Sequence, residues 1–293
     1  MATDTRALQA PFEVDIEDVE YVRHGDKPLL ARIFRPRGLG PFPAVVEAHG
    51  GAWCLGSRLN NDPINTPVAR GGVVVAALDF RMPPDASYPG SVADVNYGIR
   101  WLKANAARFA TRAEWVGTMG TSSGGHLAVL AALKPHDPRY AAIPSPPGAT
   151  AVNARVPYVV TLWPVICPLG RYRYMKGHQA GGNARLTPAS AIAHQDAYWI
   201  TEEAMGEGSP ALAMERGDRV EMPHILYVQH PRDEIHPRSN LDQFVTGYRK
   251  AGGRLELEFF EGEAYDALRS HPAAPASIKA VERIVDFIRS HAG

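Results

Sequence analysis

The chain has 293 residues, of which 45% are hydrophobic and 21% are charged, and its 31 basic residues balance 31 acidic ones to a formal net charge of zero. This length and composition suit one large globular domain with a buried core. Without a basic surplus or a run of like charge, the sequence excludes the electrostatic footprint of a nucleic-acid-binding protein and of a polybasic membrane patch.

The N-terminal segment 1–10 comes first along the chain, and it lacks the cationic start and apolar stretch of a secretory signal. No later apolar run approaches the roughly 20 residues that span a bilayer. Two cysteines, Cys54 and Cys167, are too few for a disulfide framework and have no metal-ligand spacing. We therefore expect a cytoplasmic protein without a membrane partner.

Predicted strands and helices then alternate along most of the chain. The run 71–80 is apolar and rich in valine, which is typical of a parallel strand covered by helices on both faces. The segment 91–106 carries one apolar stripe and predicts a helix. The other strands are predicted at 14–21, 29–34, 43–48, 114–119, 156–162, 223–229 and 254–260. The alternation predicts an α/β fold with a mostly parallel central sheet flanked by helices.

The alternation stops between Leu162 and Pro223. This stretch is rich in proline and glycine and is too long for an ordinary connection between a strand and a helix. We predict that residues 1–293 form a single domain with a cap or lid insertion at approximately 164–215.

A serine between glycines provides the first chemical signal. The sequence Gly120-Thr121-Ser122-Ser123-Gly124 fits G-x-S-x-G, with a predicted strand before it and a helix after it. That arrangement is a nucleophile elbow, in which a sharp turn presents the serine hydroxyl above the sheet. We expect Ser122 to be the nucleophile.

The second signal is His49-Gly50-Gly51-Ala52-Trp53, which follows an earlier predicted strand. Small residues in such a loop let backbone N–H groups approach a tetrahedral oxyanion. We expect the oxyanion hole to consist of the N–H groups of Gly51, Ala52 and Ser123. Gly50, Trp53 and Tyr265 are the candidate substrate contacts.

These motifs, together with Asp79-Phe80-Arg81-Met82-Pro83-Pro84 running into Tyr88-Pro89-Gly90, resemble the hormone-sensitive-lipase-like branch of the α/β hydrolases, which includes bacterial carboxylesterases and acetyl esterases. The resemblance covers nearly the whole chain. It implies an α/β-hydrolase fold with an eight-stranded, mostly parallel sheet, a cap, and a Ser–Asp–His triad that acts on short acyl esters. Ala52, Thr121 and Ser123 depart from the residues common in that branch, but they leave the backbone donors in place.

The resemblance also indicates the acid and the base. Asp233 occupies the position of the triad aspartate, with Glu234 as the neighbouring alternative. Tyr265 stands where the branch carries its histidine, and a tyrosine with a pKa near 10 is a poor base at neutral pH. We take His271, in the same loop, as the candidate base. A lost or altered base, or another histidine such as His236, stays open, although three residues past Asp233 is an awkward position.

The sequence thus predicts a serine hydrolase that cleaves small carboxylic esters through an acyl-enzyme, with a small-molecule ester as its partner and no cofactor. The histidines have no H-x-x-x-H or H-E-x-x-H spacing, so we expect no metal. Two alternatives remain: an amidase or formamidase, because His-Gly-Gly-x-Trp also occurs in kynurenine-formamidase-like relatives, and a hydrolysis-impaired binding protein resembling the plant gibberellin receptor, because of Tyr265. A homodimer is left open.

Overall fold

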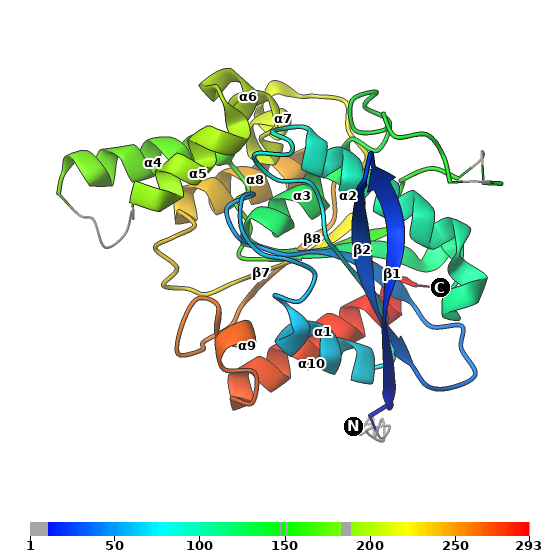
Figure 1. Cartoon of the computed structure of the whole chain (residues 1–293). Coiled ribbons are helices and arrows are strands. Elements are labelled where there is room, and N and C mark those ends of the chain that lie inside the picture. The colour runs from blue at the N-terminus through cyan, green and yellow to red at the C-terminus, as the bar shows by residue number, and fades with distance from the viewer. Residues whose placement is uncertain (1–10, 147, 150–151, 183–188, 293) are drawn as a thin grey trace.

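The fold is built on one eight-stranded sheet, seen nearly edge-on in the computed structural model (Figure 1). The structure describes residues 11–146, 148–149, 152–182 and 189–292, so the expectation for segment 1–10 lies outside the described residues. The strand order is β1-β2-β4-β3-β5-β6-β7-β8. The strands are β1 (Val14–His24), β2 (Lys27–Pro36), β3 (Ala44–Ala48), β4 (Val74–Leu78), β5 (Val116–Thr121), β6 (Tyr158–Leu162), β7 (His224–Gln229) and β8 (Leu255–Phe259).

The sheet is parallel from β4 to β8, and only β1 and β2 run antiparallel to their neighbours. Every residue of β3, β4, β5 and β6 is buried. Strands with both faces covered need apolar side chains on both faces, which explains the continuous apolar sequence of β4. The prediction of a mostly parallel central sheet is confirmed.

Helices cover both faces of the sheet. In Figure 1, α1, α9 and α10 lie on one face, while α2, α3 and α8 lie on the other. Their bounds are α1 (Asp62–Arg70), α2 (Gly90–Ala104), α3 (Ser122–Leu133), α8 (Arg238–Lys250), α9 (Ala267–Ser270) and α10 (Pro275–His291). Two short 3₁₀ turns follow α2, η1 (Ala106–Phe109) and η2 (Ala113–Trp115).

Helix α1 is absent from the sequence prediction, and its prolines explain why. Pro63 occupies the first turn, where a missing N–H costs little, but Pro67 lies inside the helix and removes a hydrogen bond. The helix persists because Ile64 and Val68, four residues apart, are both fully buried in the core beneath the sheet.

Four helices fill the connection between β6 and β7, where the alternation in the sequence stops. They are α4 (Pro168–Ala180), α5 (Ala189–Trp199), α6 (Glu202–Glu207) and α7 (Pro210–Arg216). In Figure 1 they lie beyond α3 and α8, on the side of the sheet away from α10. Residues 183–188 of the predicted insertion lie outside the described residues. None of the helices in the described part of the chain is long and apolar enough to cross a membrane.

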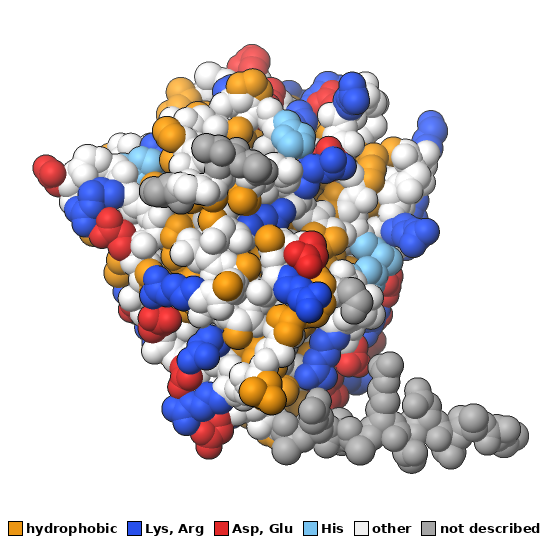
Figure 2. Space-filling view, turned by 90° about the vertical axis from the view of Figure 1, so that its right-hand side faces the viewer, with side chains coloured by type: hydrophobic (Ala, Val, Ile, Leu, Met, Phe, Trp, Pro, Cys, Tyr) orange, Lys and Arg blue, Asp and Glu red, His pale blue; other side chains and the backbone are white. Residues whose placement is uncertain are grey.

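Charges of both signs are interspersed on the face shown in Figure 2, as the balanced composition predicts. The edge strand β1 carries ion pairs, such as Glu20–Arg23 within the strand and Asp15–Arg35 with the neighbouring strand β2. A charged edge strand resists pairing with a second sheet.

Candidate active site

Ser122 lies at the sharp turn from β5 into α3 that the sequence predicts. Its φ is +50°, a left-handed conformation that is strained for a residue with a side chain and that is concentrated at functional sites. The turn leaves no room beside it: a Cβ on Gly124 would lie 2.1 Å from the carbonyl oxygen of Ala48, and one on Gly120 would lie 2.5 Å from that of Gly124. Glycine at these two positions lets β3, β5 and α3 meet closely enough to hold the turn.

The Ser122 hydroxyl is paired with a histidine from the loop after β7. Its Oγ lies 3.1 Å from Nε2 of His236, and Nδ1 of His236 lies 2.9 Å from Oδ2 of Asp233. A carboxylate accepts but does not donate, so this contact places the ring proton on Nδ1 and leaves Nε2 free to accept the serine proton. The three side chains form a continuous hydrogen-bonded chain.

The turn from Asp233 to His236 explains how two side chains only three residues apart meet. Oδ1 of Asp233 accepts hydrogen bonds from the backbone N–H groups of Ile235 and His236, at 2.9 and 3.0 Å. Asp233 thereby caps its own turn, just before α8 begins at Arg238. A turn of helical pitch brings residues i and i+3 onto one side, so Asp-x-x-His before a helix is the sequence signal for this pair.

Two side chains brace this loop through its carbonyl groups. Gln229, at the end of β7, donates from Nε2 to the carbonyl oxygen of His236 at 3.0 Å. Arg171, from α4, donates from Nε to the carbonyl oxygen of Ile235 at 3.2 Å and is only 6% exposed. Burial lowers the pKa of the Arg171 guanidinium to about 10, against the attraction of the Tyr265 hydroxyl and of Asp233. The segment between β6 and β7 therefore helps to position the histidine.

Asp233 is held in its ionised form. Burial raises the pKa of this carboxyl group, but the nearby His236 and the hydrogen bonds from His236 and Ile235 outweigh it, so the pKa lies below its ordinary value. Carboxylates that accept several hydrogen bonds behave in this way. A charged Asp233 stabilises a positive charge on His236, as a base that has taken up a proton requires.

His271 does not meet the expectation that it turns toward Ser122. It follows the short helix α9, half exposed, with its Nδ1 3.0 Å from the Ser270 hydroxyl and its Nε2 3.5 Å from Glu263. The base position in the hydrogen-bonded chain is taken by His236 instead. The loop after β8 folds into α9 and points His271 outward, a feature that no sequence motif reveals.

Tyr265 lies beside this histidine rather than in its place. Its ring centroid is 5.6 Å from that of His236 and 6.3 Å from that of Trp163. Burial raises the pKa of the Tyr265 hydroxyl further above 10, so it does not act as a base at neutral pH. An aromatic ring packed against His236 restricts the imidazole, and the reason for expecting a lost base disappears.

The predicted oxyanion loop adopts an unusual backbone next to the elbow. Gly51, Ala52 and Trp53 have φ values of +124°, +52° and +61°. The carbonyl oxygen of Gly51 accepts the N–H groups of Cys54 and Leu55, at 3.0 and 2.9 Å, which closes the turn. Within the part of the chain that the structure describes, the N–H groups of Gly51 and Ala52 donate to no protein acceptor. Successive amides in a left-handed turn form a concave donor surface suited to an anion.

The buried side chain of Trp53 anchors this loop. Its burial corrects the expectation that Trp53 contacts the substrate. Its side chain is 1% exposed and stacks on Tyr198 at 5.4 Å, so no substrate reaches the ring. Its indole Nε1 donates to Nδ1 of His126 at 3.2 Å, and Nε2 of His126 donates to the carbonyl oxygen of Gly208 at 2.8 Å. Burial lowers the pKa of His126 to about 4, which keeps it neutral. His126 therefore joins the oxyanion loop, α3 and the segment before α7.

A second buried network holds the other side of the loop. The backbone N–H of Gly50 donates to Oγ1 of Thr121 at 3.0 Å, and Nδ2 of Asn61 donates to the same oxygen. Nδ2 of Asn61 also lies 2.7 Å from Oε1 of Glu47, whose Oε2 accepts from Asn65 at 3.2 Å. Gly50 is thus fixed against the residue that precedes the nucleophile. Its role as a substrate contact stays a prediction.

The Glu47 carboxyl group makes stability depend on pH. Burial raises its pKa from 4.5 to about 7, although hydrogen bonds from Asn61 and Asn65 lower it. Since the folded pKa lies above the unfolded one, the folded chain binds the proton more tightly than the unfolded chain. The free energy of unfolding therefore falls as the pH rises from 4.5 to 7. A shift of this size corresponds to about 3 kcal/mol.

We expect Glu47→Gln to raise the free energy of unfolding above pH 7, relative to the wild-type chain, and to remove most of that dependence. Nδ2 of Asn65 faces this carboxylate, and its Oδ1 is buried with no partner among the described residues, so the new amide can donate to Oδ1 once the Asn65 amide turns over. Urea denaturation at pH 5 and pH 8 measures the difference, with Glu282→Gln on exposed helix surface as the control. A parallel pH profile in Glu47→Gln and the wild-type chain would contradict the assignment.

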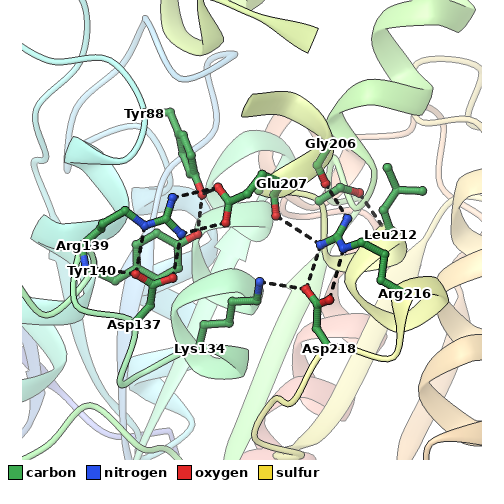
Figure 3. A network of polar contacts seen from close by, with 12 residues as sticks. Tyr88, Lys134, Asp137, Arg139, Tyr140, Gly206, Glu207, Leu212, Arg216 and Asp218 are labelled. Carbon is green, nitrogen blue, oxygen red and sulfur yellow. Dashed lines mark hydrogen bonds and ion pairs between the residues drawn. The ribbon is translucent and has the colours of Figure 1, made fainter. Parts of the chain in front are cut away.

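Polar contacts fasten the α6 segment to the body of the molecule (Figure 3). Glu207, the last residue of α6, accepts hydrogen bonds from the Tyr88 hydroxyl and from Arg139, the latter at 2.7 Å. The Tyr88 hydroxyl also contacts that of Tyr140 at 2.5 Å. The next residue is Gly208, whose carbonyl oxygen accepts from His126. The network therefore holds the segment around Gly208 in place, and this segment supports the oxyanion loop through His126.

Comparison with known proteins agrees with this architecture. A protein-family model described as BD-FAE matches residues 33–163, which include the oxyanion loop and the elbow. The chain is 28% identical over 267 residues to esterase LipC of Mycobacterium tuberculosis, covering 87% of this chain and 62% of that protein. It is 24% identical over 260 residues to the probable carboxylic ester hydrolase LipM of the same organism, covering 87% and 57%. The chain thus spans about three fifths of the length of these curated relatives.

Among solved structures, the chain is similar to a hyperthermophilic esterase from the archaeon Pyrobaculum calidifontis. The TM-score is 0.76 at 22% sequence identity, and the alignment covers 95% of this chain and 86% of that one. At this identity the likeness concerns the fold, and it extends over nearly all of it.

Proposed function

The chain is an α/β hydrolase of the hormone-sensitive-lipase-like kind, and from that premise we propose that it is a serine esterase that cleaves small carboxylic esters with Ser122, His236 and Asp233 as its triad. The observation that carries this proposal is the hydrogen-bonded chain from Oγ of Ser122 through His236 to Asp233, with distances of 3.1 and 2.9 Å. The similar proteins LipC and LipM are named an esterase and a probable carboxylic ester hydrolase, which supports the same activity.

Acylation follows from the direction of these hydrogen bonds. Nε2 of His236 accepts the proton as the Ser122 oxygen bonds to the ester carbonyl carbon, and Asp233 stabilises the imidazolium that results. The collapsing tetrahedral intermediate expels the alcohol, which takes the proton from His236. Water then repeats the sequence on the acyl-enzyme and releases the carboxylic acid.

The oxyanion of each tetrahedral intermediate accepts hydrogen bonds from backbone N–H groups. We assign these donors to Gly51 and Ala52, from the left-handed turn, and to Ser123, in the first turn of α3. A donor of this kind contributes about 3 kcal/mol to transition-state stabilisation. The first turn of α3 adds the positive end of its dipole on the same side.

The helices α4 to α7 serve as the cap of this site in our proposal. Two contacts support this proposal: Arg171 contacts the His236 loop, and Gly208 contacts His126. They connect the segment α4 to α7 both to the triad and to the oxyanion loop. Trp53, Tyr198 and Trp199 pack together beneath it. A cytoplasmic location and a homodimer stay predictions.

Hydrolysis of p-nitrophenyl acetate, combined with labelling by a fluorophosphonate probe, tests the proposed function. We expect ester turnover and one covalent adduct per chain, on the tryptic peptide that contains Ser122, with no adduct in Ser122→Ala. Ser270→Ala, an exposed serine on α9, is the control that should label normally. Turnover of an N-formyl amide without turnover of the ester would contradict the proposal.

A further inference from the structure

A group of metal-ligating side chains lies far from the active site. Among the residues that the structure describes, His224, Glu256 and His291 each bring a ring nitrogen or a carboxylate oxygen within 4.8 Å of the other two. His224 begins β7, Glu256 lies in β8, and His291 ends α10. Three elements separated in the sequence thus bring two imidazoles and one carboxylate together.

This group lies at the opposite end of the sheet from the triad. His224 is the first residue of β7, whereas the loop that carries His236 follows the last residue of the same strand. A strand rises about 3.3 Å per residue, so the strand alone separates the two places by roughly 20 Å. The group therefore belongs to neither the triad nor the oxyanion loop.

The orientation of His291 suits a metal ligand. Its Nδ1 lies 2.7 Å from the carbonyl oxygen of Phe287, one helical turn earlier. A carbonyl oxygen only accepts, so Nδ1 carries the proton and Nε2 keeps its lone pair. Histidines that bind metals almost always donate their other ring N–H in this way, because the contact fixes the tautomer and the ring orientation.

The other two side chains are also held in place. Nε2 of His224 lies 3.2 Å from Oε1 of Glu256, and Arg283 contacts the other oxygen of that carboxylate. Arg283 also binds Glu258 at 3.0 Å, which offsets part of its charge. Phe287 packs against both imidazoles, with ring centroids 5.4 Å from His224 and 4.3 Å from His291.

We propose that His224, Glu256 and His291 bind one divalent transition-metal ion of the Zn²⁺ class, with water in the fourth position, and that this ion fastens the end of α10 to the sheet. Two nitrogens and one carboxylate oxygen are a ligand set that Zn²⁺ accepts, while Mg²⁺ and Ca²⁺ prefer oxygen alone. On binding, the ion takes the place of the proton that Nε2 of His224 donates to Glu256, and that proton moves to Nδ1 of the same ring. This proposal replaces the sequence expectation of no metal, which considered only spacing within one helix.

Calorimetric titration of the full chain with Zn²⁺ at pH 7.5 tests the proposal. We expect one equivalent bound, an affinity lower by at least about tenfold in His291→Gln and in Glu256→Gln, and a melting temperature that rises with Zn²⁺ only where the group is intact. The matched control is His178→Gln. The Nδ1 of His178 contacts the carbonyl oxygen of Tyr174 at 3.0 Å, one helical turn earlier, and its ring packs against Tyr174 as that of His291 does against Phe287.

Equal Zn²⁺ affinity in the wild-type chain and in both site variants would overturn the proposal, as would an equal loss of affinity in His178→Gln. Binding of several equivalents without a preferred site would overturn it too, because exposed histidines alone explain that result. Circular dichroism of the variants without Zn²⁺ verifies that they fold, so that lost binding reports lost ligands.

Discussion

Replacing His236 by alanine is expected to lower kcat for p-nitrophenyl acetate by roughly four to six orders of magnitude, while the protein stays folded. His236 is the only histidine of the described residues whose ring lies within hydrogen-bond distance of the Ser122 hydroxyl, at 3.1 Å. Without it, Ser122 has no acceptor for its proton, and Asp233 loses the group that it orients. The backbone donors of the oxyanion loop account for the activity that remains.

His271→Ala is the matched control for that variant and separates the two candidate bases. Among the described residues, the polar contacts of its half-exposed ring are with Ser270 and Glu263, so kcat should change less than about twofold. Tyr265→His should also give no gain in rate, because His236 already occupies the base position. A collapse of activity in His271→Ala, or a large gain in Tyr265→His, would contradict the proposed triad.

Gly124→Ala is expected to destabilise the protein by about 3 kcal/mol and to abolish most of the activity. The added Cβ would lie 2.1 Å from the carbonyl oxygen of Ala48 and 2.3 Å from that of His49, and neither backbone atom can move without moving β3. Because the oxyanion loop starts at the end of β3, the displacement moves the donors away from the Ser122 oxygen. A shift of about 1 Å there is enough to lower the rate about a hundredfold.

Gly177→Ala provides the comparison for this substitution. Gly177 lies inside α4, and a Cβ there would meet no atom within 4 Å. Alanine is the better helix former, so this variant should be more stable by up to about 1 kcal/mol with unchanged kcat. Urea denaturation and ester hydrolysis of the two variants give both quantities. Equal behaviour of the two variants would show that close packing at the elbow is unimportant.

Much of the fold could be predicted from the sequence because it depends on local patterns. The buried strand β4 and the helix α2 each carry the pattern of their structure, and their ends differ from the prediction by only a few residues. Helix α1 was missed because Pro67 opposes a helix locally and burial of Ile64 and Val68 outweighs it. That outcome depends on tertiary packing, which a window of sequence does not contain.

The candidate site also has parts that local sequence indicates and parts that depend on tertiary structure. The turn at Ser122 and the loop at Gly51 have signatures in short motifs, and the sequence indicated both positions. The base does not, because it depends on how the chain turns between Asp233 and His236 and on where α9 directs His271. Family position alone led to the loop after β8, where this chain has Tyr265. No local motif indicates the His224–Glu256–His291 group, because its members come from two strands and a helix end.

The rate at which a fluorophosphonate labels Ser122 tests the central claim most directly, because the reaction requires an activated hydroxyl and no particular substrate. The account predicts rapid labelling in the wild-type chain and in His271→Ala, and labelling slower by at least about a thousandfold in His236→Ala. Labelling of His236→Ala at the wild-type rate would contradict the account, since Ser122 would then owe its reactivity to another group.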